Sequence, residues 1–190
     1  MACDFCKEST MGIGTRTDYG SIIIYKIGAS DKDGWFATLS PKTGGDPEKD
    51  FTIQLMSSAH LTQFSEIAGS DELAKNYGIA FSNITFAMTK LMESENPDFK
   101  PISESKESAV SLATYGKSTN WKEKTEHLHI KIFPFRGAVG QPYTVDSSFG
   151  KKEIFTQDSG EYVKMIPVKK VNINYERVEK LSKDLIDYLK

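Results

Sequence analysis

Short apolar runs between turn residues predict the strands of this chain. Residues 21–27 (SIIIYKI) and 34–40 (GWFATLS) are two such runs around a polar turn, which is typical of a hairpin. Residues 41–49 are rich in Gly and Pro, which favours a turn before the next strand. Residues 126–133 (EHLHIKIF) alternate between polar and apolar with period two, and this strand is expected to stop at Pro134. The predicted strands are residues 21–27, 34–40, 51–56, 109–115 and 126–133.

Two segments have helical spacing instead. From Ser70, a suitable helix cap, apolar residues recur every three or four positions as Leu73, Tyr77, Phe81 or Ala80, Ile84, Met88 and Leu91. A second amphipathic helix is predicted over 174–190, near the end of the chain. Residues 137–160 show no clean period and receive no assignment. Strands in a meander, with one long helix between the third and the fourth, predict an α+β fold in a single domain.

Composition narrows the function classes. The 190 residues carry 24 basic and 26 acidic side chains, a net charge of −2, which excludes an extended nucleic-acid surface and makes any phosphate recognition local. No apolar stretch approaches the ~20 residues of a membrane-spanning helix. Residues 1–10 lack the basic start and the apolar run of a secretory signal. We therefore expect a cytoplasmic protein without membrane contact, in which a structural disulfide is disfavoured.

Two of the three histidines lie in the predicted fifth strand. Because side chains alternate between the faces of a strand, His127, His129 and Lys131 share one face. The residues between them are apolar and are predicted to enter the core: Leu128, Ile130 and Ile132. Two imidazoles and an ammonium in a row are uncommon on a face built for packing alone. The alternative is the solvated face of an edge strand.

The two cysteines suggest a metal. Cys3 and Cys6 have the two-residue gap with which two thiolates bind one zinc ion, and a tetrahedral site needs two further ligands. His60 follows the predicted third strand. If that strand neighbours the fifth, His60 and one histidine of the pair converge. The same spacing fits a redox-active dithiol or two buried thiols, so both interpretations remain open.

In these features the chain resembles the histidine triad (HIT) superfamily. The matching segments run from residue 3 to 136: CDFCKE, GWFATLSP, SSAHLTQF, the long helix, and HLHIKIFP in the place of the His-φ-His-φ-His-φ-φ signature. The resemblance implies a five-stranded antiparallel sheet with packed helices, paired across a dyad as a homodimer. Residues 137–190 would form a C-terminal helical extension of a single domain spanning 1–190. The terminal helix would then lie over the active face or extend a dimer interface.

The resemblance also implies roles for individual residues. His129 matches the nucleophile that attacks the α-phosphorus of a nucleoside phosphate and forms a nucleotidyl-histidine, which water or a second phosphate then resolves. This implies a nucleotide hydrolase or nucleotidyltransferase. In zinc-bearing branches, which include galactose-1-phosphate uridylyltransferase, the first signature histidine joins the C-x-x-C and the upstream histidine around zinc. The implied ligands are Cys3, Cys6, His60 and His127. Such a zinc is structural, because four protein ligands leave no open position.

Lys131 departs from the family pattern, since it stands where hydrolases have the third histidine. Lysine can neutralise charge on phosphate oxygens but is a poorer proton shuttle, so phosphate binding is less in doubt than hydrolysis. The alternative for Lys131 is a solvated strand residue. The alternative for the whole protein is a non-catalytic, zinc-stabilised nucleotide-binding or interaction module. Further candidates for contacts with phosphate or ribose are Ser40, Ser118, Asn120 and Thr125. Trp35, Phe36 and Trp121 are candidates to stack on a base, with burial in the core as their alternative.

Overall fold

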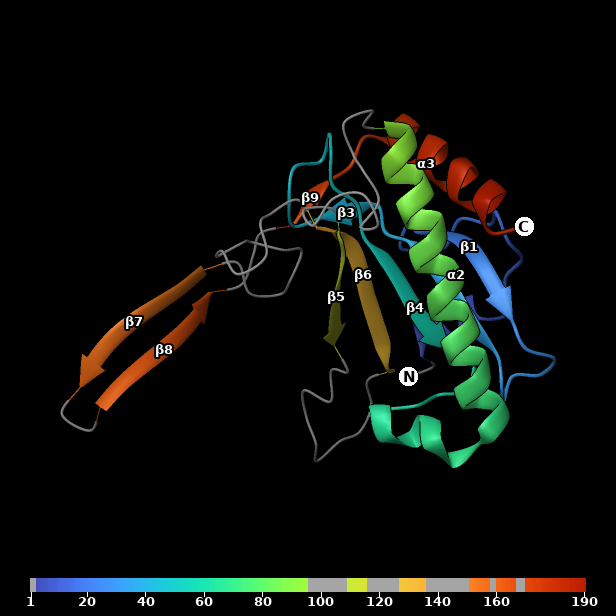
Figure 1. The fold of residues 1–190 in the computed structure, drawn as a ribbon, viewed down its shortest axis with the longest axis horizontal. Coiled ribbons are helices and arrows are strands. Elements are labelled where there is room, and N and C mark those ends of the chain that lie inside the picture. The colour runs from blue at the N-terminus through green and yellow to red at the C-terminus, as the bar shows by residue number, and fades with distance from the viewer. Residues whose placement is uncertain (1–2, 96–108, 116–126, 136–150, 158–159, 167–169) are drawn as a thin grey trace.

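The computed structural model describes residues 3–95, 109–115, 127–135, 151–157, 160–166 and 170–190. Its centre is one antiparallel sheet with strand order β1-β2-β4-β6-β5 (Figure 1). These strands are β1 Ile22–Ile27, β2 Trp35–Leu39, β4 Ile53–Ser57, β5 Ala109–Tyr115 and β6 His129–Phe135. The predicted α+β class with an antiparallel sheet is confirmed. The predicted hairpin is β1 paired with β2.

Two helices cover one face of this sheet. The long helix α2, Asp71–Glu95, begins as predicted after Ser70, whose hydroxyl accepts a hydrogen bond from the Leu73 backbone N–H at 3.3 Å. The terminal helix α3, Tyr175–Tyr188, is capped by Asn174 and lies beside α2 (Figure 1). A short 3₁₀ helix, η1 Phe64–Gly69, precedes α2. The helices and this face of the sheet form one apolar core, which includes Leu128, Ile130, Ile132, Val178, Leu181 and Leu185.

The opposite face is covered differently. The helix α1, Asp4–Glu8, has only five residues, and Phe5 and Met11 pack there against a small buried cluster of Ile23, Phe36 and Met56. Trp35 points to the helix side, where its Nε1–H donates to the Leu73 carbonyl at 3.0 Å. Both Trp35 and Phe36 are fully buried, so the interpretation of these two as base-stacking residues is wrong, and core packing is their role.

The structure corrects several sequence expectations. Strand β6 runs through Pro134 to Phe135. Its pairing with β4 has already ended at Ile132, so the missing amide hydrogen of Pro134 costs no bond on that side. The helix α3 does not lie over the face that carries His129, because its buried side chains join the core with Ile130 and Ile132 on the other face.

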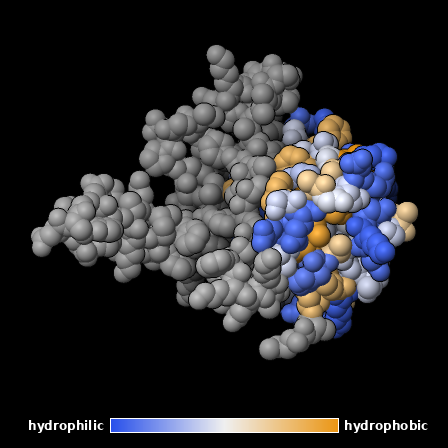
Figure 2. All heavy atoms as spheres, turned by 90° about the horizontal axis from the view of Figure 1, so that it is seen from below, coloured by the Kyte–Doolittle hydropathy of each residue, from blue (hydrophilic) through white to orange (hydrophobic). Residues whose placement is uncertain are grey.

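Two further pairings were not predicted. The short strands β3, Lys42–Thr43, and β9, Val171–Asn172, pair with each other, and β7, Lys151–Gln157, pairs with β8, Gly160–Ile166. Figure 1 shows the β7–β8 ribbon away from the main sheet. Among the described residues, no helix is long and apolar enough to cross a membrane. Hydrophilic and apolar side chains are interspersed over the described part of the face seen in Figure 2.

Candidate metal centre and histidine face

The metal centre begins with the cysteine turn, residues 3–6. Cys3 has an extended backbone and caps α1, and its carbonyl accepts a hydrogen bond from the Lys7 backbone N–H at 3.2 Å. This closes one helical turn over both cysteines. Residues three apart on such a turn project from the same side. The sequence therefore presents two thiols to a common point.

Long-range pairing supplies the two histidines. Strand β4 is hydrogen-bonded to β6, as the zinc hypothesis required, and His60 lies in the loop that follows β4. The Leu128 backbone N–H donates to the Leu61 carbonyl at 2.7 Å, which ties that loop to the residues entering β6. His60 and His127 each precede one member of this hydrogen bond. Their rings lie edge to face with centroids 5.0 Å apart.

The four donor atoms have the spacing of a tetrahedral zinc site. Cys3 Sγ lies 3.4 Å and Cys6 Sγ 3.6 Å from His127 Nδ1, and Cys6 Sγ lies 3.3 Å from His60 Nδ1. A tetrahedron with Zn–S of about 2.3 Å and Zn–N of about 2.05 Å has S···N edges of about 3.6 Å. All four ligand atoms lie within 4.8 Å of one another. The donor set and its geometry thus fit a four-coordinate structural zinc, which confirms the predicted cofactor.

His127 is held in the tautomer that a metal ligand needs. Its Nε2–H donates to the Ser57 carbonyl at 2.8 Å, which leaves the lone pair of Nδ1 for zinc. The ring is 3% exposed, and this burial lowers its pKa to about 4, so it is neutral near pH 7. The Ser57 hydroxyl donates to the Ala59 carbonyl at 2.7 Å and braces the same loop. Ser57 had no sequence signal, because it acts on His127 through its backbone.

The Cys6 thiol needs the metal in order to ionise near neutral pH. Burial, followed by a hydrogen bond with Cys3 and its charge, raises the pKa of the Cys6 thiol to about 11 in the metal-free chain. A redox-active dithiol instead requires a lowered thiol pKa. Together with the two imidazoles beside the sulfurs, this favours the zinc interpretation over a dithiol oxidoreductase.

His129 lies next to the metal centre and is not one of its ligands. Its Nδ1 lies 3.2 Å from the His127 carbonyl oxygen, which can only accept, so Nδ1 carries the proton. The lone pair is then on Nε2. The Phe5 ring packs against both imidazoles, with centroids 5.6 Å from His129 and 5.7 Å from His127. The sequence analysis did not identify Phe5 as a functional candidate, although its position between Cys3 and Cys6 in the C-x-x-C motif was a signal for it.

Lys131 is buried, with 3% of its surface exposed, so the interpretation as a solvated strand residue is wrong. The interpretation of this segment as an edge strand is also wrong, because β6 has β4 on one side and β5 on the other. Register places Lys131 opposite Gln54, and Gln54 opposite Thr38. Directly opposed residues share a face of the sheet. A polar row therefore crosses three strands beside the row that contains His129.

The candidate substrate contacts fare differently. Ser40 follows β2, where its hydroxyl donates to the Lys42 carbonyl at 2.9 Å and accepts from the Lys42 N–H at 3.1 Å. By register it lies four residues along the sheet from the row of His129, roughly 13 Å at about 3.3 Å per residue. The structure thus gives Ser40 a turn-stabilising role and does not bring it to His129. Ser118, Asn120 and Thr125, like Trp121, lie outside the described residues.

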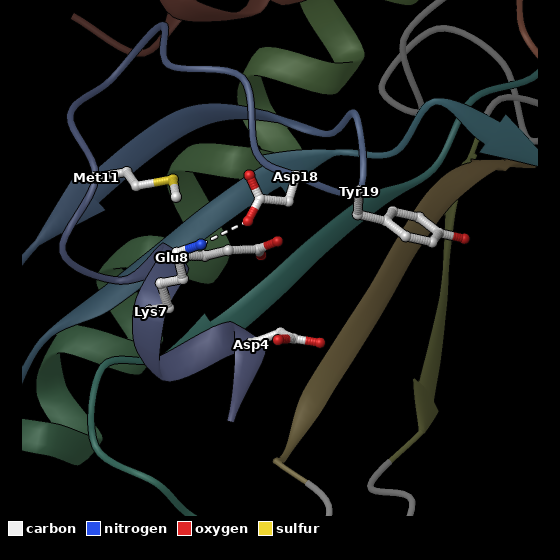
Figure 3. A pocket seen from close by; sticks show the side chains of 6 residues that line it. All are labelled: Asp4, Lys7, Glu8, Met11, Asp18 and Tyr19. Atoms are coloured by element: carbon white, nitrogen blue, oxygen red, sulfur yellow. Dashed lines mark hydrogen bonds and ion pairs between the residues drawn. The ribbon is translucent and has the colours of Figure 1, made fainter. Parts of the chain in front are cut away.

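A cavity of about 250 Å³ lies on the other side of α1 (Figure 3). Its walls carry the carboxylates of Asp4, Glu8 and Asp18, and the ammonium of Lys7 is paired with Asp18 at 2.5 Å. Burial raises the pKa of the Glu8 carboxyl, whereas the Lys7 hydrogen bond lowers that of Asp18. The excess of negative charge makes this cavity unfavourable for a phosphate.

Comparison with known proteins adds no assignment: no family model matches the chain, and neither the curated proteins nor the solved structures yielded a match.

Proposed function

We propose that this protein is a zinc-stabilised, HIT-like nucleotide hydrolase or nucleotidyltransferase in which His129 is the nucleophile. The observation that carries the proposal is the contact of 3.2 Å between His129 Nδ1 and the His127 carbonyl oxygen. It directs the nucleophilic lone pair to Nε2 and orients the ring. His127 is itself held by Ser57 and has the geometry of a zinc ligand. Rigid support of this kind is what positioning a reacting atom requires.

In the proposed reaction, His129 Nε2 attacks the α-phosphorus of a nucleoside phosphate. The N–P bond forms as the bond from phosphorus to the leaving oxygen breaks. The imidazole becomes positively charged, and the His127 carbonyl stabilises it through the Nδ1–H bond. Water or a second phosphate then attacks phosphorus, the N–P bond breaks, and neutral His129 is restored. A bound zinc would supply structural support to this strand and no Lewis acidity.

Lys131 is the proposed electrostatic partner of this step. It lies two residues from His129 on the same face, so the Cα atoms of the two residues are about 7 Å apart along the strand. A cation there favours charge that develops on phosphate oxygens, which is often the largest catalytic term. Ser118, Asn120 and Thr125 remain proposed contacts to phosphate or ribose, and a homodimer the proposed assembly.

The test is to incubate the zinc-loaded protein with dinucleoside polyphosphates, nucleoside phosphoramidates and nucleotide sugars. We expect turnover of one class and a nucleotidyl mass on the peptide that contains His129 after acid-free quenching. His129→Ala should lose both signals and keep its zinc. His60→Ala is the matched control, since it removes an imidazole from the metal and leaves the proposed nucleophile in place. Turnover that survives His129→Ala contradicts the proposal.

The second candidate is a nucleotide-binding module without turnover. It is favoured by one observation, the buried lysine in place of a third histidine. Lys131→His separates the two candidates because it restores a side chain able to pass a proton to the leaving group. A rise in turnover identifies an enzyme limited by leaving-group protonation. Equal nucleotide affinity in wild type and His129→Gln, with no covalent adduct, identifies the binding module.

A further inference from the structure

We propose that the cysteine turn is also a peroxide-sensitive switch, in which Cys3 and Cys6 are oxidised to a disulfide and zinc is released. Three features of the metal centre support this: the spacing of the sulfurs, their accessibility, and the position of the cysteine turn at the start of a helix of only five residues. The inference concerns the chain's own thiols and does not depend on any nucleotide.

The two sulfurs are already placed for a disulfide. They belong to one helical turn, closed by the hydrogen bond from the Lys7 N–H to the Cys3 carbonyl, and they lie within 4.8 Å of each other. A disulfide tolerates Cα atoms about 4.4–6.8 Å apart, a range that includes the first and fourth residues of a helical turn. Bond formation therefore needs side-chain rotation and little backbone movement.

The metal centre is open on one side. His60 is exposed and both cysteines are partly exposed, whereas His127 is buried. A small oxidant can thus approach the sulfurs from the side of His60. The buried side, with His127 held by Ser57, remains in place when the thiolates are consumed.

The chemistry balances with hydrogen peroxide as the oxidant. One zinc-bound thiolate attacks the O–O bond and becomes a sulfenic acid, while the other oxygen leaves as water after taking a proton. The second thiolate attacks that sulfur, forms the S–S bond and displaces hydroxide, which a second proton converts to water. Two sulfurs lose one electron each and peroxide gains two. Zinc, left with two histidine ligands, dissociates.

Loss of zinc should loosen the cysteine turn at the start of α1. A helix of five residues has no independent stability. The residues that follow it stay anchored, because Lys26 Nζ donates to the Ser9 carbonyl at 2.6 Å and Met11 packs against the sheet. Phe5 lies between the two cysteines and packs on His129. Movement of the cysteine turn therefore changes the packing of Phe5 against His129. This last consequence rests on the proposed function.

The experiment treats the zinc-loaded full chain with hydrogen peroxide and follows zinc with a colorimetric chelator and the cysteine-turn peptide by mass spectrometry. We expect one zinc per chain to be released as the peptide loses two hydrogens, and dithiothreitol with zinc to reverse both changes. Zinc loss accompanied only by added oxygen, or zinc retained while the peptide is oxidised, overturns the proposal.

Cys3→His is the matched variant, because histidine replaces the ligand but removes the second thiol. It should release zinc roughly tenfold more slowly or slower still, because no thiol resolves the sulfenic acid. Release at the wild-type rate overturns the proposal. If this variant fails to bind zinc, Cys6→His replaces it in the same release assay. The loss of two hydrogens from the wild-type peptide then remains the direct test of the disulfide. No readout involves a nucleotide, so failure here is distinguishable from failure of the proposed function.

Discussion

The two faces of the main sheet are stabilised by different interactions. On one face α2 and α3 bury a continuous apolar core against the strands. On the other, the buried cluster of Ile23, Phe36 and Met56 is joined by the five-residue α1 and by four metal ligands. Within the described residues, the second face thus has a smaller apolar cluster, and metal coordination adds to it. This arrangement leaves room for polar groups such as His129 and Lys131 on the sheet, which a helix-covered face would exclude.

Removing a metal ligand should have the largest effect, confined to the α1 face. Structural zinc sites contribute about 10–16 kcal/mol of apparent binding free energy in finger peptides. His127→Ala should reduce bound zinc from one per chain to near zero, as measured by elemental analysis, while circular dichroism keeps the signal of α2 and α3. His129→Ala is the control and should keep zinc. A full complement of zinc in His127→Ala would show that the ligand set is wrong.

A substitution in the core under the helices should have the opposite pattern: a loss of stability without a loss of zinc. Leu181 is fully buried in the core between α3 and the sheet. Leu181→Ala should lower the free energy of unfolding by about 2–5 kcal/mol, through lost apolar contacts and a cavity. Zinc affinity should be unchanged, as measured by chelator competition at a temperature where the variant is folded. Lys183→Ala, at an exposed position of the same helix, should stay within about 0.5 kcal/mol of wild type.

Acidity between pH 8 and 6 should weaken the metal centre. The pKa of Cys6 is about 11 without metal, so zinc binding releases at least one full proton near neutral pH. His127, with a pKa of about 4, is already neutral above pH 6 and releases none. Apparent zinc affinity should therefore rise at least about tenfold, or 1.4 kcal/mol, for each pH unit from 6 to 8. An affinity independent of pH in chelator competition would contradict the assignment of Cys6 as a ligand.

The smallest expected effect concerns a helix cap. Ser70→Ala removes the acceptor of the Leu73 N–H and should cost about 1 kcal/mol of unfolding free energy, without affecting zinc. The control is Ser82→Ala, at an exposed position inside α2, which should be neutral or slightly stabilising. A greater loss in Ser82→Ala than in Ser70→Ala would show that the hydroxyl at the helix start does not act as a cap.

Local pattern and ligand chemistry predicted a large part of this molecule. Periodicity identified the hairpin, the long helix and the terminal helix, because apolar spacing within one element is a local property. The zinc ligands were identified through the resemblance to HIT proteins, and the pairing of β4 with β6 now brings them together. Few soft or borderline ligands are available in this chain, so the set had few alternatives.

What the sequence did not reveal depends on contacts between distant segments. The β3–β9 pair joins Lys42 to Asn172, and no local period reports such a partner. Strand β7 lies in the segment left unassigned, residues 137–160, and β8 begins at its last residue, although Asp158, Ser159 and Gly160 are typical turn residues. Burial of Lys131 was missed because strand alternation gives the face and says nothing of what covers it. The hydroxyl of Ser40 is used within its own turn, which motif matching does not detect.

The separation of the zinc ligands along the chain has a consequence for biosynthesis. Cys3 and His127 are 124 positions apart. At about 5–20 residues per second, translation supplies the last donor roughly 6–25 s after the first. Both sulfurs are therefore synthesised well before the last imidazole of the set. Metal acquisition is thus a late event of maturation, and a ribosome that stalls before the sixth strand leaves an incomplete coordination sphere.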